Sequence, residues 1–319
     1  MVFQRRNTQM KIKTLFLALL SFCFSFVVFA QEEIVVYKTT LVTVDDWKLS
    51  AKFLPPKDDK PVVIFLHSLG SNMSDWRLLI NEMASMGYGY MTLDFRGHGG
   101  SVYRIDGRVA VVDDFRRTGI DNQFNRMVND VFSAIRYLNN KGIVTNRIIL
   151  AGAGIGANIA IKSAAVEKDI KMIALFSPTL NASRDVLTVN PLKEYGKRPV
   201  FMATSVETPT IFREASILQA IAYLQVGPEY VTFVVALRKN SADLINNNSR
   251  ESEDIRGKFI EWLKNPYKPE ETIVEPEVEF ELYDFEDSFW GEEFEDISNA
   301  VKTYDGNGLS LPFMPAKTP

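Results

Sequence analysis

The chain has 319 residues, of which 46% are hydrophobic and 24% are charged, and its formal net charge is −4. A chain of this length and composition can bury a substantial core, which excludes a small scaffold that depends on disulfides or metals. It contains one cysteine, Cys23, and two histidines, His67 and His98. The basic residues are not clustered, which argues against nucleic acid as a partner.

The first 30 residues predict a secretory signal peptide. Basic residues at positions 5, 6, 11 and 13 precede an uncharged, apolar run from 15 to 29, and Ala30 ends a small-residue cleavage site. We therefore expect removal of residues 1–30 and export to the periplasm or the extracellular medium. The alternative is an uncleaved membrane anchor through residues 14–30, although a span needs about 20 apolar residues. Because Cys23 lies inside this run, the mature chain has no disulfide and no thiol chemistry.

Strand and helix patterns alternate along the first half of the body. Alternating and continuous apolar runs predict strands, and apolar residues spaced by three and four predict helices. The expected elements are a β-hairpin formed by residues 34–44 and 49–53, a strand at 61–66, a helix at 74–86, a strand at 88–93 and a long helix at 121–140.

The alternation continues to about residue 264. The expected elements are strands at 147–151, 171–176, 199–203 and 230–237, with helices at 157–166, 211–224 and 254–263. Strands that alternate with helices imply a parallel sheet with right-handed crossovers. The fold class is therefore α/β, with a mostly parallel sheet, an N-terminal antiparallel hairpin and helices on both faces.

Three short motifs follow predicted strands in order. H-S-L-G occupies residues 67–70, D-F-R-G-H-G occupies 94–99, and G-A-G-I-G occupies 152–156, between a strand and a helix. Strand, sharp turn and helix are the setting of the nucleophile elbow, G-x-S-x-G. In these motifs the body resembles the serine-hydrolase branch of the α/β-hydrolase superfamily over about residues 34–264. The short segment from 177 to 198, where that fold carries its cap, implies a minimal lid.

The resemblance also shows what is missing. The nucleophile position of the elbow, between Gly152 and Gly156, is Gly154, which has no side chain. In this fold the catalytic histidine follows the nucleophile in the chain, and no histidine follows residue 154. By the resemblance, Asn240 occupies the histidine position. Glu207 is the carboxylate nearest the acid position, with Val206 or Thr208 as alternatives.

The remaining family positions imply an oxyanion site without a nucleophile. His67, Ser68 and Leu69 belong to the oxyanion loop, and the amides of Leu69 or Ser68 and of Ile155 would form the hole. His67 and His98 are expected to hold loops by hydrogen bonds, and no metal site or cofactor is indicated. A displaced catalytic set would have to draw on Asp94, His98, Ser101 or Glu207.

The C-terminal segment forms a separate region. We divide the chain into a signal peptide (1–30), a hydrolase-like domain (31–266) and an acidic, aromatic-containing extension (267–319). Residues 270–296 carry 13 acidic and no basic side chains, and six aromatic residues lie within 280–294. Such a segment is either solvated and partly disordered or a docking segment for a protein partner or for the mildly basic body.

Three functions remain open. The first is an exported, catalytically degenerate hydrolase homologue that binds a small molecule in the old cleft or a protein through the tail. The second is a serine-type ester or peptide hydrolase with a displaced catalytic set. The third is a structural envelope protein, which tail-dependent localisation would favour.

Overall fold

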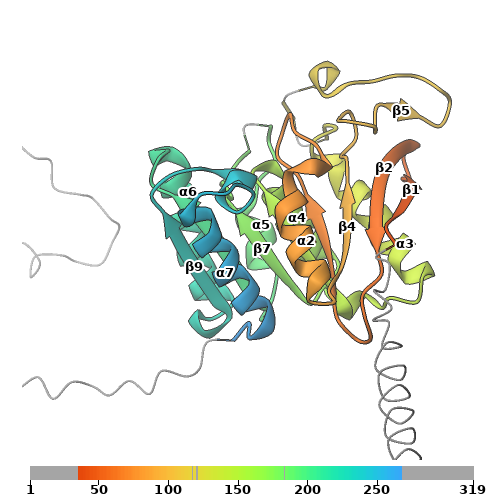
Figure 1. The fold of residues 1–319 in the computed structure, drawn as a ribbon. Coiled ribbons are helices and arrows are strands. Elements are labelled where there is room, and N and C mark those ends of the chain that lie inside the picture. Colours follow the sequence, from red (N-terminus) through yellow and green to blue (C-terminus); the bar gives the residue numbers. More distant parts are fainter. Residues whose placement is uncertain (1–34, 117, 120, 183, 268–319) are drawn as a thin grey trace, which may run out of the picture. The chain divides into compact units, whose positions relative to one another are not determined.

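A computed structural model describes residues 35–116, 118–119, 121–182 and 184–267 (Figure 1). The predicted signal peptide and the acidic extension lie outside these residues, so both stay predictions. In the part of the chain that is described, no helix is long and apolar enough to cross a membrane.

A nine-stranded sheet forms the centre of the fold, in the order β1-β2-β4-β3-β6-β7-β8-β9, with β5 paired to β2. The strands β4, β3, β6, β7, β8 and β9 are neighbours in this order and run parallel. The pairs β1–β2, β2–β4 and β2–β5 are antiparallel. The predicted hairpin and mostly parallel sheet are therefore confirmed. The strands are β1 (Tyr37–Val42), β2 (Trp47–Leu54), β3 (Val62–Leu66), β4 (Gly89–Leu93), β5 (Tyr103–Arg104), β6 (Ile148–Ala153), β7 (Met172–Phe176), β8 (Val200–Ser205) and β9 (Val231–Ala236).

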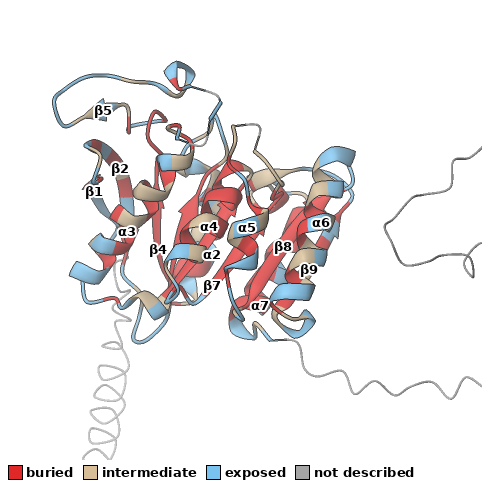
Figure 2. Cartoon of the chain, turned by 180° about the vertical axis from the view of Figure 1, so that it is seen from behind, coloured by how far each residue is buried: buried red, intermediate tan, exposed pale blue. Residues whose placement is uncertain are grey.

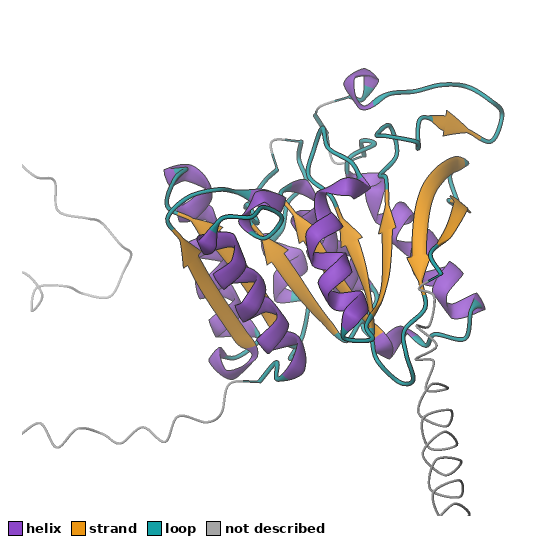
Figure 3. Cartoon of the chain, in the orientation of Figure 1, coloured by secondary structure: helices purple, strands orange, loops and turns teal. Residues whose placement is uncertain are grey.

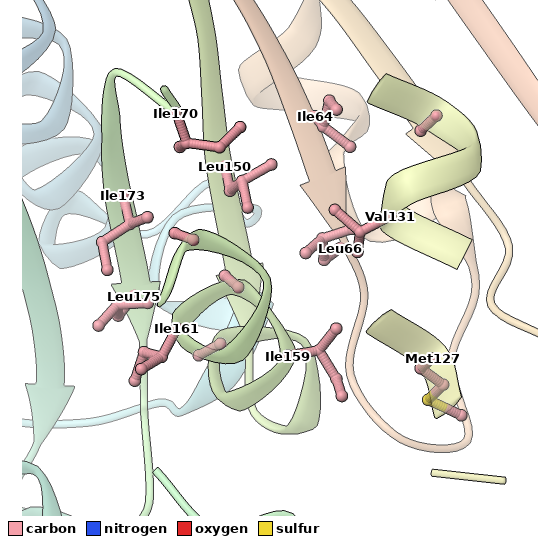
Figure 4. Close-up of a cluster of buried hydrophobic side chains, with 14 of the residues drawn as sticks. Ile64, Leu66, Met127, Val131, Leu150, Ile159, Ile161, Ile170, Ile173 and Leu175 are labelled. Carbon is pink, nitrogen blue, oxygen red and sulfur yellow. The ribbon is translucent and has the colours of Figure 1, made fainter. Parts of the chain in front are cut away.

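Helices cover both faces of this sheet (Figure 3). One buried cluster includes Trp76, Phe176 and Phe259 and packs α2 and α7 against the sheet. The other includes Val131, Leu150 and Ile159 and packs α3, α4 and α6 against the opposite face (Figure 4). Because both faces are covered, the central strands are buried along their whole length (Figure 2). The helices are α2 (Arg77–Ser85), α3 (Val128–Asn140), α4 (Ile155–Val166), α5 (Val189–Lys193), α6 (Pro209–Gln225) and α7 (Arg250–Lys264).

Two regions differ from the sequence expectation. The helix expected from residue 121 begins at Val128, after a 3-10 turn. The Asn122 side chain bonds the backbone of Asn125, Gly119 and Arg184, and these bonds hold the segment before Val128 in a non-helical conformation. The two-residue strand β5 and the short helix α5 were also not expected. Both are too short for a periodic pattern to reveal them.

The short segment after β7 is tied to α4. The Asn158 side chain donates to the Val186 carbonyl oxygen (3.0 Å) and to Thr179 Oγ1 (3.2 Å), and it accepts from the Thr179 amide (3.1 Å). Asn158 is fully buried. The predicted minimal lid is therefore a fixed part of the domain that contains α5.

Arg96, from the D-F-R-G-H-G motif, makes the main buried ion pair. Its Nη2 lies 2.7 Å from Asp130 of α3, and its Nη1 lies 2.5 Å from Asp45 in the turn between β1 and β2. Its guanidinium lies over the Trp47 ring at 5.6 Å. Burial opposes ionisation of Asp45, but the hydrogen bonds and charge of Arg96 hold the pKa of Asp45 below its usual value. Arg96 thus joins the hairpin, the motif loop and α3.

We expect Asp130→Ala to lower the free energy of unfolding by about 3–5 kcal/mol, because the variant leaves a buried guanidinium short of a partner. The matched control is Asp121→Ala, which removes an equally short but exposed pair with Arg126 and should change stability little. Urea unfolding measures both. Equal losses in the two variants would contradict a structural role for the buried pair.

Candidate functional site

The turn between β6 and α4 has the backbone conformation of a nucleophile elbow. Gly154 lies there with φ 54° and ψ −119°, and its amide donates to the Phe176 carbonyl oxygen at 2.9 Å. A residue with a side chain is strained in this region, by about 1–3 kcal/mol. Gly154 adopts it freely because it has no Cβ.

The flanking glycines have a different reason. A Cβ on Gly152 would lie 2.2 Å from the Gly156 carbonyl oxygen, and a Cβ on Gly156 would lie 2.3 Å from the Leu66 carbonyl oxygen. The backbones of β3, β6 and α4 therefore meet too closely for any side chain at these two positions. A Cβ on Gly154, in contrast, would lie 3.2 Å from Ser241 Oγ and 3.5 Å from Ser68 Oγ.

Two backbone amides beside the elbow remain available. Among the described residues, the amides of Leu69 and Ile155 donate to no hydrogen bond, whereas the Ser68 amide faces Asp75 Oδ2 at 3.5 Å. Of the two alternatives for the loop donor, Leu69 is therefore the free one. The Ser68 hydroxyl is buried and has no partner among these residues.

Asn240 is held in a network of neutral groups. Its Oδ1 accepts from Ser177 Oγ (3.3 Å) and Ser205 Oγ (3.2 Å), and its Nδ2 donates to Thr208 Oγ1 (3.0 Å). The Ser241 amide in turn donates to Ser177 Oγ at 2.8 Å. Hydroxyl and amide groups thus surround the position where the family has an imidazole, and none of them can serve as a general base near neutral pH.

Thr208, rather than Glu207, contacts Asn240. The Glu207 carboxylate accepts from the Lys239 amide at 2.8 Å instead. Of the three candidates for the acid position (Val206, Glu207 and Thr208), Thr208 is therefore the one whose side chain meets Asn240. Thr208 carries no charge, so nothing at this position would orient or stabilise an imidazolium.

The backbone around Asn240 is unusual. Ser177, Lys239 and Ser241 are non-glycine residues with positive φ of 54°, 70° and 54°. Strained residues cluster at sites whose geometry is held for a function. Sequence reasoning could not reveal these conformations, because serine and lysine carry no preference for positive φ.

Both histidines are occupied by backbone hydrogen bonds. His67 Nε2 accepts from the Phe95 amide (2.9 Å) and its Nδ1 bonds the Ser68 carbonyl oxygen (2.7 Å). His98 Nε2 accepts from the Gly70 amide (3.2 Å) and its Nδ1 bonds the Arg96 carbonyl oxygen (2.9 Å). These bonds require the neutral form of each ring.

Burial has the matching effect on protonation. Desolvation lowers the pKa of His67 to about 3 and also lowers the pKa of His98. The two rings lie edge to face with centroids 4.9 Å apart, so a charge on either would disfavour a charge on the other. Both rings are therefore neutral near pH 7 and have no free nitrogen for a substrate.

The other members of the displaced set are also engaged. Asp94 accepts from the Met73 amide (2.7 Å) and the Gly100 amide (2.8 Å). Ser101 Oγ donates to the Asp94 carbonyl oxygen (2.7 Å) and accepts from the Ser50 amide (2.9 Å). Together with His98 they hold the motif loop, and no hydrogen bond joins their side chains into a catalytic relay.

Sequence reasoning missed one ionisable group beside the loop at residues 67–70, namely Asp75. Its carboxylate accepts from Ser71 Oγ and faces the Ser68 amide. Burial raises the pKa of Asp75, and the charge of Asp243 adds to the effect. In the described part of the chain, no group of three or more His, Cys, Asp or Glu residues could hold a metal ion.

Known hydrolases resemble this chain in sequence and in fold. Residues 57–213 match a family model described as serine aminopeptidase, S33. An esterase of Pyrococcus furiosus has the same fold, with a TM-score of 0.58 and 19% identity over 74% of this chain and 92% of that one. The chain has the α/β-hydrolase fold.

Other solved structures extend the comparison. A dienelactone hydrolase of Anabaena variabilis matches with a TM-score of 0.56 and 12% identity over 74% of this chain and 100% of that one. An acylaminoacyl peptidase of Pyrococcus horikoshii matches with a TM-score of 0.57 and 16% identity over 76% of this chain and 43% of that one. At these identities the likeness concerns the fold alone. A comparison with curated protein sequences finds no match.

The strain that the elbow would impose on a residue with a side chain can be measured. We expect Gly154→Ala to lower the free energy of unfolding by about 1–3 kcal/mol, because alanine disfavours its backbone conformation. The control is Gly257→Ala, an open position in α7, which should raise stability by about 0.5–1 kcal/mol. A Gly154→Ala protein as stable as the parent in urea unfolding would show that the elbow is not strained.

Protonation of the buried histidines should limit stability in acid. The pKa of His67 is about 3 in the folded chain and 6.5 when exposed, so below pH 6.5 the unfolded state binds the proton more readily. Stability then falls as the pH drops from 6.5 towards 3, by at most about 1.4 kcal/mol per pH unit for this ring. Urea unfolding between pH 7 and 5 should show a shallower slope in His67→Gln. An unchanged slope would contradict a buried, neutral His67.

Proposed function

We propose that this α/β-hydrolase homologue binds a small ligand at its former catalytic centre and does not hydrolyse it. The observation that carries the proposal is Gly154 at the elbow, beside an Asn240 that is tied to Thr208 and two serines. Acyl transfer needs a nucleophile and a base within hydrogen-bond reach of each other. Neither is provided by these residues.

The same site retains groups suited to binding. The free amides of Leu69 and Ile155 can donate to one carbonyl or carboxylate oxygen, as an oxyanion hole does. The hydroxyls of Ser68 and Ser241 border the space that a nucleophile side chain would occupy. A compact ligand with a carbonyl or carboxylate group fits this arrangement of donors.

Ester or peptide hydrolysis is the second candidate. The family model and the esterase and peptidase structures support it more directly than they support binding, because all of them describe hydrolases. It would require Asp94, His98 or Ser101 to leave the hydrogen bonds that now hold the motif loop. Because those bonds leave none of the three side chains free to act on a substrate, we favour binding over hydrolysis.

Hydrolysis of an activated short-chain ester by residues 31–319 separates the candidates. We expect slow hydrolysis that His98→Gln leaves unchanged, because an oxyanion hole without a triad still accelerates the reaction by about 10³–10⁴ over water. We expect no labelling by a fluorophosphonate, because labelling requires an activated nucleophile. Glutamine keeps an acceptor for the Gly70 amide. Fluorophosphonate labelling together with a turnover of about 1 s⁻¹ or more that is lost in His98→Gln would establish hydrolysis instead.

A restored triad supplies the positive control. The variant Gly154→Ser/Thr208→Asp/Asn240→His should gain fluorophosphonate labelling, because it returns nucleophile, acid and base to the elbow and its neighbouring loops. A folded triple variant that stays unlabelled would show that these three positions are wrongly assigned.

The binding arm uses butyrate as the probe. Its carboxylate should shift the amide NMR signals of Leu69 and Ile155 before others. Shifts spread over unrelated residues, or none at high millimolar butyrate, would count against a carboxylate site at the elbow.

A further inference from the structure

The hairpin of β1 and β2 presents lysines on a face that none of the described helices covers. The pairing register sets Lys38 against Lys52, Thr40 against Ser50, and Val42 against Lys48. The alternate residues, such as Leu41 and Leu49, are buried against the core, so these three pairs point outward. We call the surface formed by Lys38, Thr40, Val42, Lys48, Ser50 and Lys52 the hairpin face.

The charges of the hairpin face are not neutralised. In the described ranges, Lys38, Lys48 and Lys52 take part in no ion pair. Lys38 and Lys52 lie directly opposite each other, and like charges in that arrangement destabilise a sheet.

A hollow of about 360 Å³ lies at one end of the hairpin face, lined by Thr40, Lys48, Ser50, Tyr103 and Arg104 with Gly100 and Gly107. Arg104 Nη2 donates to the Asp45 carbonyl oxygen at 3.1 Å, and its Nε is buried without a partner. Asp45 pairs with Arg96 and Asp106 pairs with Arg108, while the charge of Arg104 also helps to lower the pKa of Asp106. The hollow therefore joins the N–H donors and positive charges of Lys48 and Arg104, the chemistry that recognises a phosphate.

Exposed apolar side chains, here called the apolar rim, lie on β5, just after it and in the turn after β1. Tyr103 is 51% exposed and Ile105 46%, and Val44, in the turn after β1, is 73% exposed. Tyr103 pairs with Lys48, and the Ile105 amide donates to the Asp46 carbonyl oxygen, so β5 and the residue after it lie beside β2. Lysines beside aromatic and aliphatic residues characterise surfaces that rest in the headgroup region of a membrane.

We propose that the hairpin face docks on an anionic lipid surface, with a lipid phosphate in the hollow beside Arg104. Tyr103 and Ile105 then enter the headgroup layer while Lys38 and Lys52 face neighbouring anionic lipids. A lipid surface explains both the spread of the charges and the apolar rim, whereas a free phosphate would use the hollow alone.

Vesicle sedimentation tests the proposal with the chain from Gln31 to Pro319, which keeps every described core residue and lacks the apolar run at 15–29. We expect binding to phosphatidylglycerol vesicles and not to phosphatidylcholine vesicles. Lys38→Gln/Lys52→Gln should weaken binding by about fivefold for each lysine removed. Tyr103→Ser/Ile105→Ser should weaken it as well.

The control is Lys258→Gln/Lys264→Gln on α7, which changes the net charge equally at exposed positions. Equal effects of the two lysine pairs would overturn the proposal, since attraction would then be a property of net charge. The Lys38→Gln/Lys52→Gln variant should unfold at no lower urea concentration than the parent, because it removes opposed like charges. A variant that binds the vesicles as the parent does but is much less stable would also overturn the proposal.

Soluble anions distinguish a lipid surface from a free phosphate or an acidic protein segment as the ligand of the hairpin face. Release of the protein from vesicles by low-millimolar inorganic phosphate would assign the hollow to a free phosphate. Binding to a polyglutamate peptide with no binding to vesicles would assign the face to an acidic protein segment. Either result would replace the lipid surface as the occupant.

Discussion

The close approach of three backbones at the elbow is the constraint on which the site depends. The carbonyl oxygens of Gly156 and Leu66 occupy the space that side chains at positions 152 and 156 would need. This contact locks the end of β3, the end of β6 and the first turn of α4 to one another. It therefore sets where the amides of Leu69 and Ile155 lie, whatever residue stands at position 154.

The chemistry of the site is separable from that framework. An active hydrolase needs a nucleophile, a base and a carboxylate in contact, and under the proposed assignment glycine, asparagine and threonine stand in these places. The replacement is coherent, because Asn240 satisfies both its donor and its acceptor among neutral hydroxyls. A charged group left alone in this network would lack a partner, so the loss of one charged member of a triad favours the loss of the others.

A second network links the core to the opposite end of the sheet. Arg96 holds α3 through Asp130 and the β1–β2 turn through Asp45, and the guanidinium groups of Arg96 and Arg104 each lie 5.6 Å from the centre of the Trp47 ring. The orientation of the hairpin face therefore follows from a buried ion pair in a loop that active hydrolases also possess. The elbow and the hairpin face share no residue, so the two proposals stand on separate observations.

Much of the fold could be predicted from the sequence, because its causes are local. Continuous apolar runs such as residues 62–66 indicated buried parallel strands, and the glycines at 152 and 156 indicated a tight turn between strand and helix. The absence of a side chain at 154 and of any histidine beyond it is a property of the sequence alone. These two absences predict, without the tertiary structure, that the usual triad is missing.

The tertiary structure decided which groups meet. Thr208 rather than Glu207 contacts Asn240, because the direction of a side chain after β8 depends on the loop from β9 that packs against it. Both histidines lose their free nitrogens to amides and carbonyls brought from other loops. The lysines of the hairpin share a face only through the pairing register, which joins residues distant in the chain. Sequence determined which chemical groups are present, and long-range packing determined their partners, because hydrogen bonds and cross-strand contacts depend on distances that no local pattern encodes.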